Sequence, residues 1–299
     1  MGLYHDPGWH ELVATEFLLC YNAAFRAFTP DPPAFRKMML DTGAVISGST
    51  ALYFLLRQPL GWKPDDVDII AAGAAYEILL AFILTLPGAV VLSDTFDDKR
   101  EEGQGPYDDA YPYAGLKRLV RVSTAMARFD VIHSSGSVPS NAITHYWGSH
   151  VMNAITADSV LCAYPTLTLA YKAMQIRAAV GGDPVTKYRK RGFEVFARGH
   201  STANLAHTHY DSVTCASRDR YFGDDATLIV PIRQPSHSAE RTVHKREQNG
   251  STYQVSAWRL GGPACGTAEC YLASFSHFEE ITVISGKAQR RPLRESFIV

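Results

Sequence analysis

The chain has 299 residues, enough for one large domain or two smaller ones. Its hydrophobic content of 46% and charged content of 20% are typical of a globular protein and exclude a wholly disordered chain. A formal net charge of −1 excludes the overall basic excess of a dedicated duplex-binding protein, so contact with nucleic acid requires a local basic patch.

The cysteine content indicates a reducing compartment, and the hydropathy indicates a chain without a membrane segment. The five cysteines are scattered and odd in number, unlike the disulfide framework of a small secreted domain: Cys20, Cys162, Cys215, Cys265 and Cys270. The N-terminal residues lack the basic start and apolar run of a signal peptide. The most apolar stretch, 78–92, is shorter than the about 20 residues that span a bilayer, and Pro87 interrupts it. We therefore expect an intracellular protein, cytoplasmic or nuclear, with no membrane segment.

The chain opens with a helix pattern, followed by a strand, a turn and a second helix. Apolar residues at helical spacing predict a helix over 9–28, which the proline-rich stretch 30–33 is expected to end. The β-branched segment 43–47 predicts a short strand. It runs directly into Gly48 and Ser49, which predict a tight turn and a capped helix.

Alternating acidic and apolar residues predict the next strand, over 66–70. A helix over 72–86 and a strand over 89–92 complete a β-α-β-α-β opening, which indicates a layered α/β or α+β architecture. Residues two apart on a strand point to the same face. The strand over 66–70 is therefore expected to present Asp66 and Asp68 together.

A change of composition follows these elements. The stretch 94–115 is rich in Asp, Glu, Gly, Tyr and Pro without apolar periodicity, and it predicts a long exposed loop of the lid or binding type. Two strand patterns follow, at 118–122 and 128–132, and their spacing predicts a hairpin. The second strand carries Asp130, the third acidic residue of interest.

The rest of the chain is expected to be helical first and then β-containing. Residues 139–177 indicate interrupted helix, most clearly over 166–177, and 183–198 indicates a helix with a basic face. Strand patterns return at 227–232, 253–258 and 281–285. We predict an α+β fold, a mixed sheet flanked by helices, in three parts: a catalytic core over 1–135, a helical segment over 136–200 that closes the cleft, and a β-containing C-terminal region over 201–299.

The acidic patterns and the glycine turn suit the chemistry of phosphate transfer. Hard Mg²⁺ prefers carboxylate oxygens, and two such ions can neutralise a phosphate while they activate an attacking hydroxyl. Asp66 and Asp68 can hold these metals together, and Asp130 would complete the ligand set and help to deprotonate the acceptor. Backbone N–H groups at a helix start favour phosphate, Gly48 permits close approach and Ser49 adds a hydroxyl donor. The pattern predicts bound Mg²⁺ or Mn²⁺.

This order of motifs resembles the DNA polymerase beta-type nucleotidyltransferase superfamily. The resemblance covers about residues 43–133 and rests on three segments in order, 45–49, 66–69 and 129–131. It implies a nucleoside triphosphate substrate, transfer of a nucleoside monophosphate to a hydroxyl, and release of pyrophosphate. It also implies that the three acids are the catalytic, metal-binding residues and that the glycine and serine bind the nucleotide.

A looser resemblance extends through 167–174, where Lys172 is similar in position to the lysine that meets the triphosphate in toxin-type and antibiotic-modifying members. Toxin-type members continue with a Lys-Asp or Arg-Asp pair, whereas this chain continues with a basic cluster: Lys187, Arg189, Lys190 and Arg191. The segments 187–193 and 220–225 instead resemble a group of filamentous-fungal proteins with the same core.

Three hypotheses about the activity remain. The acceptor is an RNA held by the basic cluster, with an affinity that falls steeply with salt. Alternatively, the acceptor is a protein or a small molecule, without that salt dependence. The third hypothesis is an inactive module that binds nucleotide or RNA without turnover.

Other site chemistries fit the sequence less well. The spacing of His207, His209 and Cys215, and of Cys265 and Cys270, differs from that of structural zinc sites. The sequence has no phosphate-binding P-loop, no dinucleotide-binding fingerprint and no Gly-x-Ser-x-Gly turn of serine hydrolases.

Overall fold

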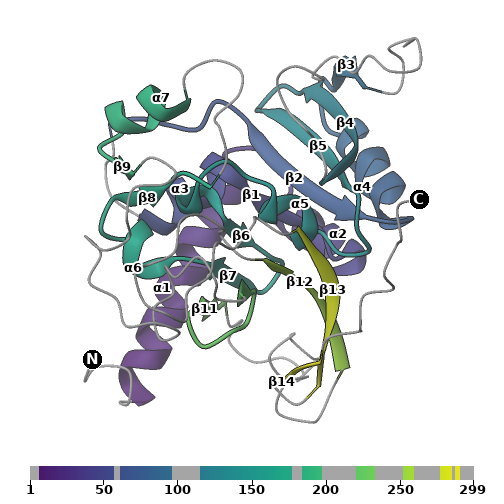
Figure 1. Cartoon of the computed structure of the whole chain (residues 1–299). Helices are drawn as coiled ribbons and strands as arrows, with labels where there is room; N and C mark the ends of the chain where they lie inside the picture. The colour runs from purple at the N-terminus through teal and green to yellow at the C-terminus, as the bar shows by residue number, and fades with distance from the viewer. Residues whose placement is uncertain are drawn as a thin grey trace, which may run out of the picture.

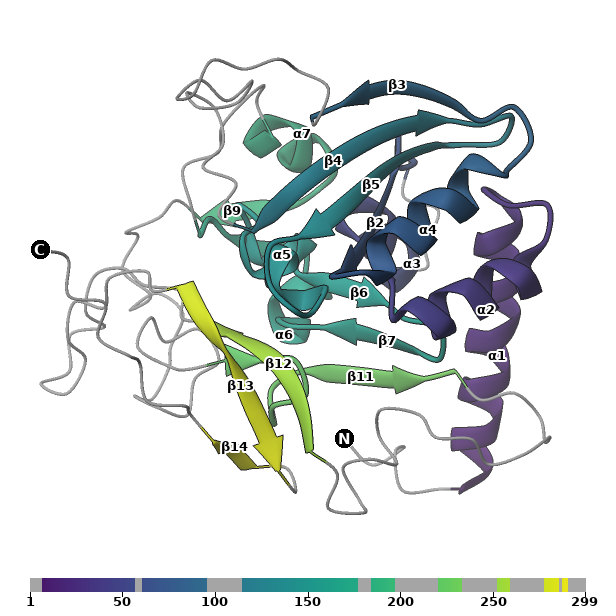
Figure 2. The ribbon, with the colours of Figure 1, turned by 90° about the vertical axis from the view of Figure 1, so that its right-hand side faces the viewer.

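The computed structural model describes residues 7–56, 61–95, 115–176, 184–196, 220–232, 252–258, 277–284 and 287–289. Within these residues the protein has the predicted α+β fold, with helices packed around an eight-stranded mixed sheet (Figures 1 and 2).

The strands of the large sheet come from most of the described chain: β1 (Val45–Ser47), β2 (Val67–Ala72), β3 (Val90–Asp94), β4 (Leu116–Ser123), β5 (Arg128–Ser134), β6 (Asn153–Ile155), β7 (Ser159–Cys162) and β11 (Leu228–Pro231). Their order across the sheet is β11-β7-β6-β1-β2-β5-β4-β3. β2 and β5 pair in parallel, and the other neighbours in this sheet pair antiparallel. The parallel pair therefore lies between two antiparallel wings.

One face of this sheet is covered by three helices (Figure 2): α1 (Pro7–Arg26), α2 (Pro32–Thr42) and α4 (Ala75–Leu84). Alternate residues of the central strands point into this helical layer. Val67 and Ile69 of β2 and Phe129 and Val131 of β5 are buried in the same apolar cluster as residues of the three helices. Because side chains alternate along a strand, the residues between them face the other side of the sheet. The acidic positions thus lie on the face away from α1, α2 and α4.

The sequence pattern does not predict α2, because we assigned the proline stretch only to the end of the preceding helix. Those prolines in fact begin α2. The carboxylate of Asp31 accepts a hydrogen bond from the backbone N–H of Ala34 at 3.0 Å and caps the helix. Proline is tolerated in a first helical turn, where the N–H has no partner within the helix. Phe35 and Met39 then bury one face of α2 in the core.

The other predicted elements of the first half are confirmed. The helix, strand, helix, strand series through β3 forms, including α3 (Gly48–Leu56) directly after β1. β4 and β5 form the predicted antiparallel hairpin. Most of the predicted loop at 94–115, namely 96–114, lies outside the described residues.

The prediction of a helical segment over 136–200 is wrong in its secondary structure. Its described residues form only short helices, and β6 and β7 enter the large sheet instead. These helices are α5 (Ser140–Thr144), a 3-10 turn (Ser149–Val151), α6 (Pro165–Thr168) and α7 (Pro184–Lys190).

The helix predicted over 166–177 stops at Thr168. Tyr171 adopts a positive φ of 56°, which interrupts helical backbone, and the chain continues as β8 (Lys172–Met174). β8 pairs in parallel with β9 (Glu194–Phe196), which also shortens the helix predicted over 183–198. A short apolar run is compatible with either a buried strand or a buried helix, and periodicity alone does not separate them.

The predicted C-terminal strands are confirmed as β11, β12 (Thr252–Trp258) and β13 (His277–Ile284). β12 and β13 belong to a second, four-stranded sheet with β10 (Arg220–Tyr221) and β14 (Lys287–Gln289), in the order β10-β12-β13-β14.

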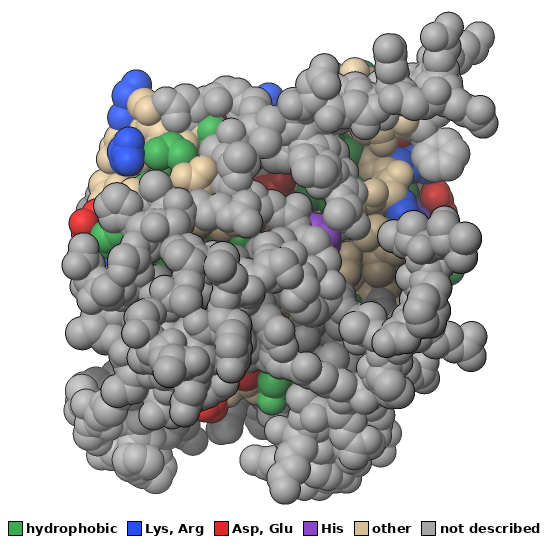
Figure 3. Space-filling view, viewed as in Figure 1, with side chains coloured by type: hydrophobic (Ala, Val, Ile, Leu, Met, Phe, Trp, Pro, Cys, Tyr) green, Lys and Arg blue, Asp and Glu red, His purple; other side chains and the backbone are tan. Residues whose placement is uncertain are grey.

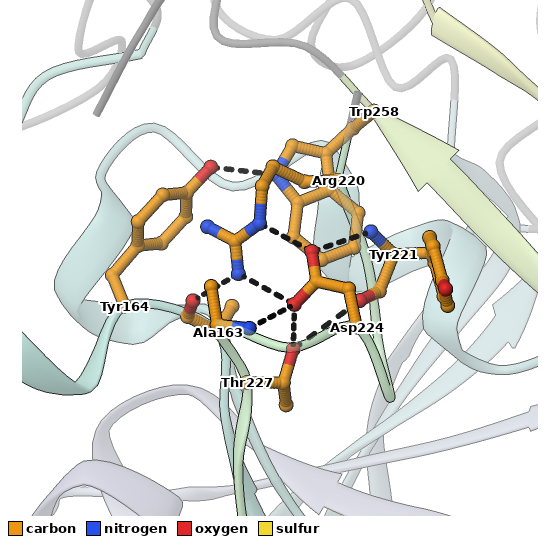
Figure 4. Close-up of polar contacts among 8 residues, drawn as sticks. Ala163, Tyr164, Arg220, Tyr221, Asp224, Thr227 and Trp258 are labelled. Carbon is orange, nitrogen blue, oxygen red and sulfur yellow. Dashed lines mark hydrogen bonds and ion pairs between the residues drawn. The ribbon is translucent and has the colours of Figure 1, made fainter. Parts of the chain in front are cut away.

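A buried ion pair ties this second sheet to the core (Figure 4). Arg220 is fully buried and donates through Nε and Nη2 to the carboxylate of Asp224. Its Nη2 also donates to the carbonyl of Ala163, next to β7, at 2.7 Å. The guanidinium lies against Tyr164 and Trp258, and the Trp258 indole donates to the Tyr164 hydroxyl at 2.7 Å. A buried charge requires its partner, so this network fixes the position of β10 and β12.

None of the described helices combines the length and apolar character needed to cross a bilayer. The residues considered for zinc lie outside the described part of the chain: His207, His209, Cys215, Cys265 and Cys270.

Candidate active site

Three carboxylates lie on the open face of the central strands. Asp66 directly precedes β2, Asp68 is the second residue of β2, and Asp68 pairs in register with Asp130 of β5. Directly opposed residues on neighbouring strands share a face, as do residues two apart on one strand. The structure therefore places the three predicted acids on one face, where we call them the acid row.

The start of α3 meets the acid row at Gly48. Ser47 pairs with Asp68 across β1 and β2, and α3 begins at the next residue. Gly48 has a φ of 61°, and a Cβ built on it would lie 2.0 Å from Oδ2 of Asp68. Glycine is thus required here both by the left-handed backbone and by the carboxylate beside it. Ser49 is the second residue of α3 and is mostly buried.

Two side-chain hydroxyls stabilise this turn by hydrogen bonds, and the sequence analysis assigned neither a role. Oγ1 of Thr50 donates to the backbone carbonyl of Asp66 at 2.7 Å, and Oγ of Ser47 donates to the carbonyl of Asn153 at 2.6 Å. The first bond joins the start of α3 to the acidic strand, and the second joins β1 to β6. The hydroxyl-bearing residues on both sides of Gly48 are the sequence signal that could have indicated these hydrogen bonds.

Each outer acid has an arginine partner, which the sequence analysis also missed. Nη2 of Arg128 lies 3.1 Å from Oδ2 of Asp66, and Nε of Arg121 lies 3.4 Å from Oδ2 of Asp130. Arg121 is directly opposite Asp130 in the hairpin register. The alternation of Arg128 with Asp130 on one strand is visible in the sequence, but the partner of Asp66 depends on the pairing of β2 with β5.

The carboxylates of the row are crowded. Burial raises the pKa of Asp68 well above its ordinary value, and the charges of the other two acids raise it further. Lys187 and Arg121 have a smaller, lowering effect on the Asp68 pKa. Burial also raises the pKa of Asp130, against the lowering effect of Arg121. A cation placed among these groups would favour their ionised forms.

The donor set suits a hard divalent cation. Oδ1 of Asp130 is buried and has no hydrogen-bond partner, and carboxylate oxygens are the ligands that Mg²⁺ and Mn²⁺ prefer. In the part of the chain that the structure describes, no three His, Cys, Asp or Glu side chains are already gathered to hold a metal. Asp66 and Asp130 would exchange arginine contacts for the metal. The chemistry of these residues suits the ion, but the side chains would have to rearrange to coordinate it.

Helix α7 brings part of the basic cluster beside the acids. Nζ of Lys187 lies 3.2 Å from Oδ2 of Asp65, the residue before Asp66, and Nη2 of Arg191 lies 3.9 Å from the same oxygen. Figure 3 shows Lys and Arg side chains at the surface over α7 and acidic side chains deeper within the same face. The other two members of the cluster are exposed.

Lys172 lies on a strand, β8, and not on the helix that we predicted for it. Its side chain is half-buried. The lysine whose charge acts on Asp68 is Lys187. The contact of Lys172 with a triphosphate stays a prediction, and Lys187 is a cationic residue of the site that the sequence analysis placed only in the basic cluster.

Comparison with known proteins gives two weak structural neighbours. No protein-family model matches the chain, and no curated protein matches it. A Thermotoga maritima CCA-adding enzyme complexed with tRNA is 15% identical over 48% of this chain and 29% of that chain, with a TM-score of 0.28. A CCA-adding enzyme in complex with CTP is 14% identical over 64% of this chain and 44% of that chain, with a TM-score of 0.38. The chain thus spans less than half the length of either neighbour.

The geometry of the site itself is therefore what bears on function. The acid row lies next to the start of α3, whose first N–H groups have no partner within the helix. Lys187 and Arg191 lie near Asp65, the residue before the row. Such a site can hold cations among its carboxylates and phosphate groups next to them.

Proposed function

We propose that this protein is a metal-dependent nucleotidyltransferase. It moves a nucleoside monophosphate from a nucleoside triphosphate to a hydroxyl group of an RNA, protein or small-molecule acceptor and releases pyrophosphate. The observation that carries the proposal is the register of Asp68 with Asp130, next to the glycine that opens α3.

In this reaction the acceptor oxygen forms a bond to the α-phosphorus, and the bond from that phosphorus to the bridging oxygen of the β-phosphate breaks. Asp130 receives the acceptor proton, since its Oδ1 is buried and has no hydrogen-bond partner. The first N–H groups of α3, at Gly48 and Ser49, hold the phosphates. Lys187 offers a further positive charge to the leaving pyrophosphate.

The divalent cations would be held by Asp66, Asp68 and Asp130. When bound, Mg²⁺ or Mn²⁺ supplies charge neutralisation at the phosphates and lowers the pKa of the acceptor hydroxyl.

A second candidate function is supported by the arginine partners of Asp66 and Asp130, which already neutralise these acids. Such a protein would bind nucleotide or RNA at the same surface without turnover. The two candidates differ in one observable, the metal-dependent release of pyrophosphate.

The test is incubation of the protein with each labelled nucleoside triphosphate, Mg²⁺ or Mn²⁺, and a cell extract as a source of acceptors. We expect label in one class of acceptor together with pyrophosphate. Asp68→Asn should abolish both. Asp41→Asn is the matched control, because Asp41 lies on α2 in an exposed ion pair with Lys37. Nucleotide binding without label or pyrophosphate would favour the second candidate.

A further inference from the structure

Beside the acid row, Arg191 is a buried cation with an unused donor. Its side chain is only 7% exposed, and its Nη1 is buried without a hydrogen-bond partner. Among the described residues, the carboxylate in ion-pair range of Arg191 is that of Asp65, which is 63% exposed and lies closer to Lys187 than to Arg191, at 3.2 Å against 3.9 Å. A buried charged donor without an acceptor carries a desolvation cost that a bound anion would remove.

The position of Arg191 is built by the residues around it. Its Cζ lies 4.0 Å from the ring centroid of Trp62 and 4.9 Å from that of Tyr188, so the guanidinium packs against two aromatic rings. Tyr53 of α3 packs edge-on against Trp62. Arg191 directly follows the end of α7, and Gly192 after it has a φ of 90°, which turns the chain away from the helix direction. The stacked guanidinium therefore has few other orientations open to it.

Trp62 supplies a second unused donor in the same contact. Its Nε1 is buried and has no hydrogen-bond partner. Two side chains in direct contact thus carry buried N–H groups that need an acceptor, and Lys187 adds a third donor group from α7, which ends at the residue before Arg191. Arginine held flat by stacking presents a rigid fork that suits the oxygens of a phosphate group.

We propose that Trp62, Lys187 and Arg191 form a phosphate-binding site beside the acid row. This site is distinct from the start of α3, and its role in transfer rests on the proposed function. Its ligand is a phosphate group. This phosphate comes either from the nucleotide or from a nucleic-acid acceptor, and the site would recognise both in the same way.

The test is calorimetric titration with two probes in the presence of EDTA, so that metal binding by the acid row does not contribute. The probes are tripolyphosphate and a short single-stranded oligoribonucleotide. Trp62→Phe keeps a ring under the guanidinium and removes the indole N–H, while Arg191→Lys keeps the charge and removes the fork. Each is expected to weaken binding by about tenfold, the effect of one lost hydrogen bond to a charged group.

Arg189→Gln is the matched control, since it removes one positive charge from an exposed position of α7, and it should change the affinity by less than about twofold. Loss with tripolyphosphate identifies the nucleotide as the source of the phosphate, and loss with the oligoribonucleotide identifies the acceptor strand. If the wild type binds neither probe, or if both variants bind as the wild type does with unchanged melting temperatures, the proposal is overturned. Asp68→Asn should abolish transfer and leave this binding intact, which separates a failure of this site from a failure of the proposed function.

Discussion

Replacement of Gly48 by alanine tests whether the acid row is the working part of the protein. The new Cβ would lie 2.0 Å from Oδ2 of Asp68, and contacts below 3.0 Å are essentially never seen, so the carboxylate has to shift by at least about 1 Å. A displacement of this size at a catalytic group costs on the order of 100-fold in rate. The left-handed backbone adds about 1–2 kcal/mol of strain for any residue with a Cβ.

Gly43→Ala separates these two effects. Gly43 has a φ of 65°, almost the same as that of Gly48, and a Cβ built on it meets nothing within 4 Å. We expect both variants to lose several degrees in melting temperature by calorimetry, but only Gly48→Ala to lose metal-dependent nucleotidyl transfer. Equal transfer rates in the two variants would refute the placement of Asp68 at the reacting phosphate.

Further predictions concern the residues that support this site and the core. Thr50→Val removes the hydrogen bond to the carbonyl of Asp66, so we expect about 1 kcal/mol less stability in urea denaturation and a lower transfer rate, and an unchanged rate would contradict a positioning role. Asp224→Ala removes the carboxylate that pairs with the buried Arg220, which should lower the free energy of unfolding by about 3 kcal/mol; a loss near zero would show that this ion pair does not hold the second sheet to the core. Burial lowers the pKa of His150 to about 3, assisted by the charge of Arg191, whereas the unfolded chain takes up this proton near pH 6.5. The unfolded state therefore binds more protons below that pH. Because of this difference, the free energy of unfolding should fall by up to about 1.4 kcal/mol per pH unit between pH 6 and 4. His150→Leu should reduce this slope in urea denaturation.

Local patterns were sufficient to predict the first half of the fold apart from α2. The glycine turn and the alternating acids each constrain a few adjacent residues, and their elements formed where the patterns put them. The prediction for residues 136–200 failed because the decisive interactions are long-range. Ile155 becomes part of a strand by pairing with Ile46, more than a hundred residues away. A short apolar segment has no local property that records such a partner.

The same distinction applies to the site. The acids were predictable because their spacing along one strand is a local property, and the register with Asp130 agrees with the predicted set. Their counterions were not predictable. Arg128 meets Asp66 only through the parallel pairing of β2 with β5.

The charges of the site bear on how it would take its substrate. Four carboxylates face four cationic side chains in the pairs and contacts described above: Asp65, Asp66, Asp68 and Asp130 with Arg121, Arg128, Lys187 and Arg191. Metal ions alone would add positive charge beside the cationic side chains, and a triphosphate alone would add negative charge beside the carboxylates. The two together would offset each other, because the metal would replace the arginines at the acids and leave the arginines to meet the phosphates. We therefore expect the site to favour the metal–nucleotide complex over either component, which is the form of substrate that the proposed reaction requires.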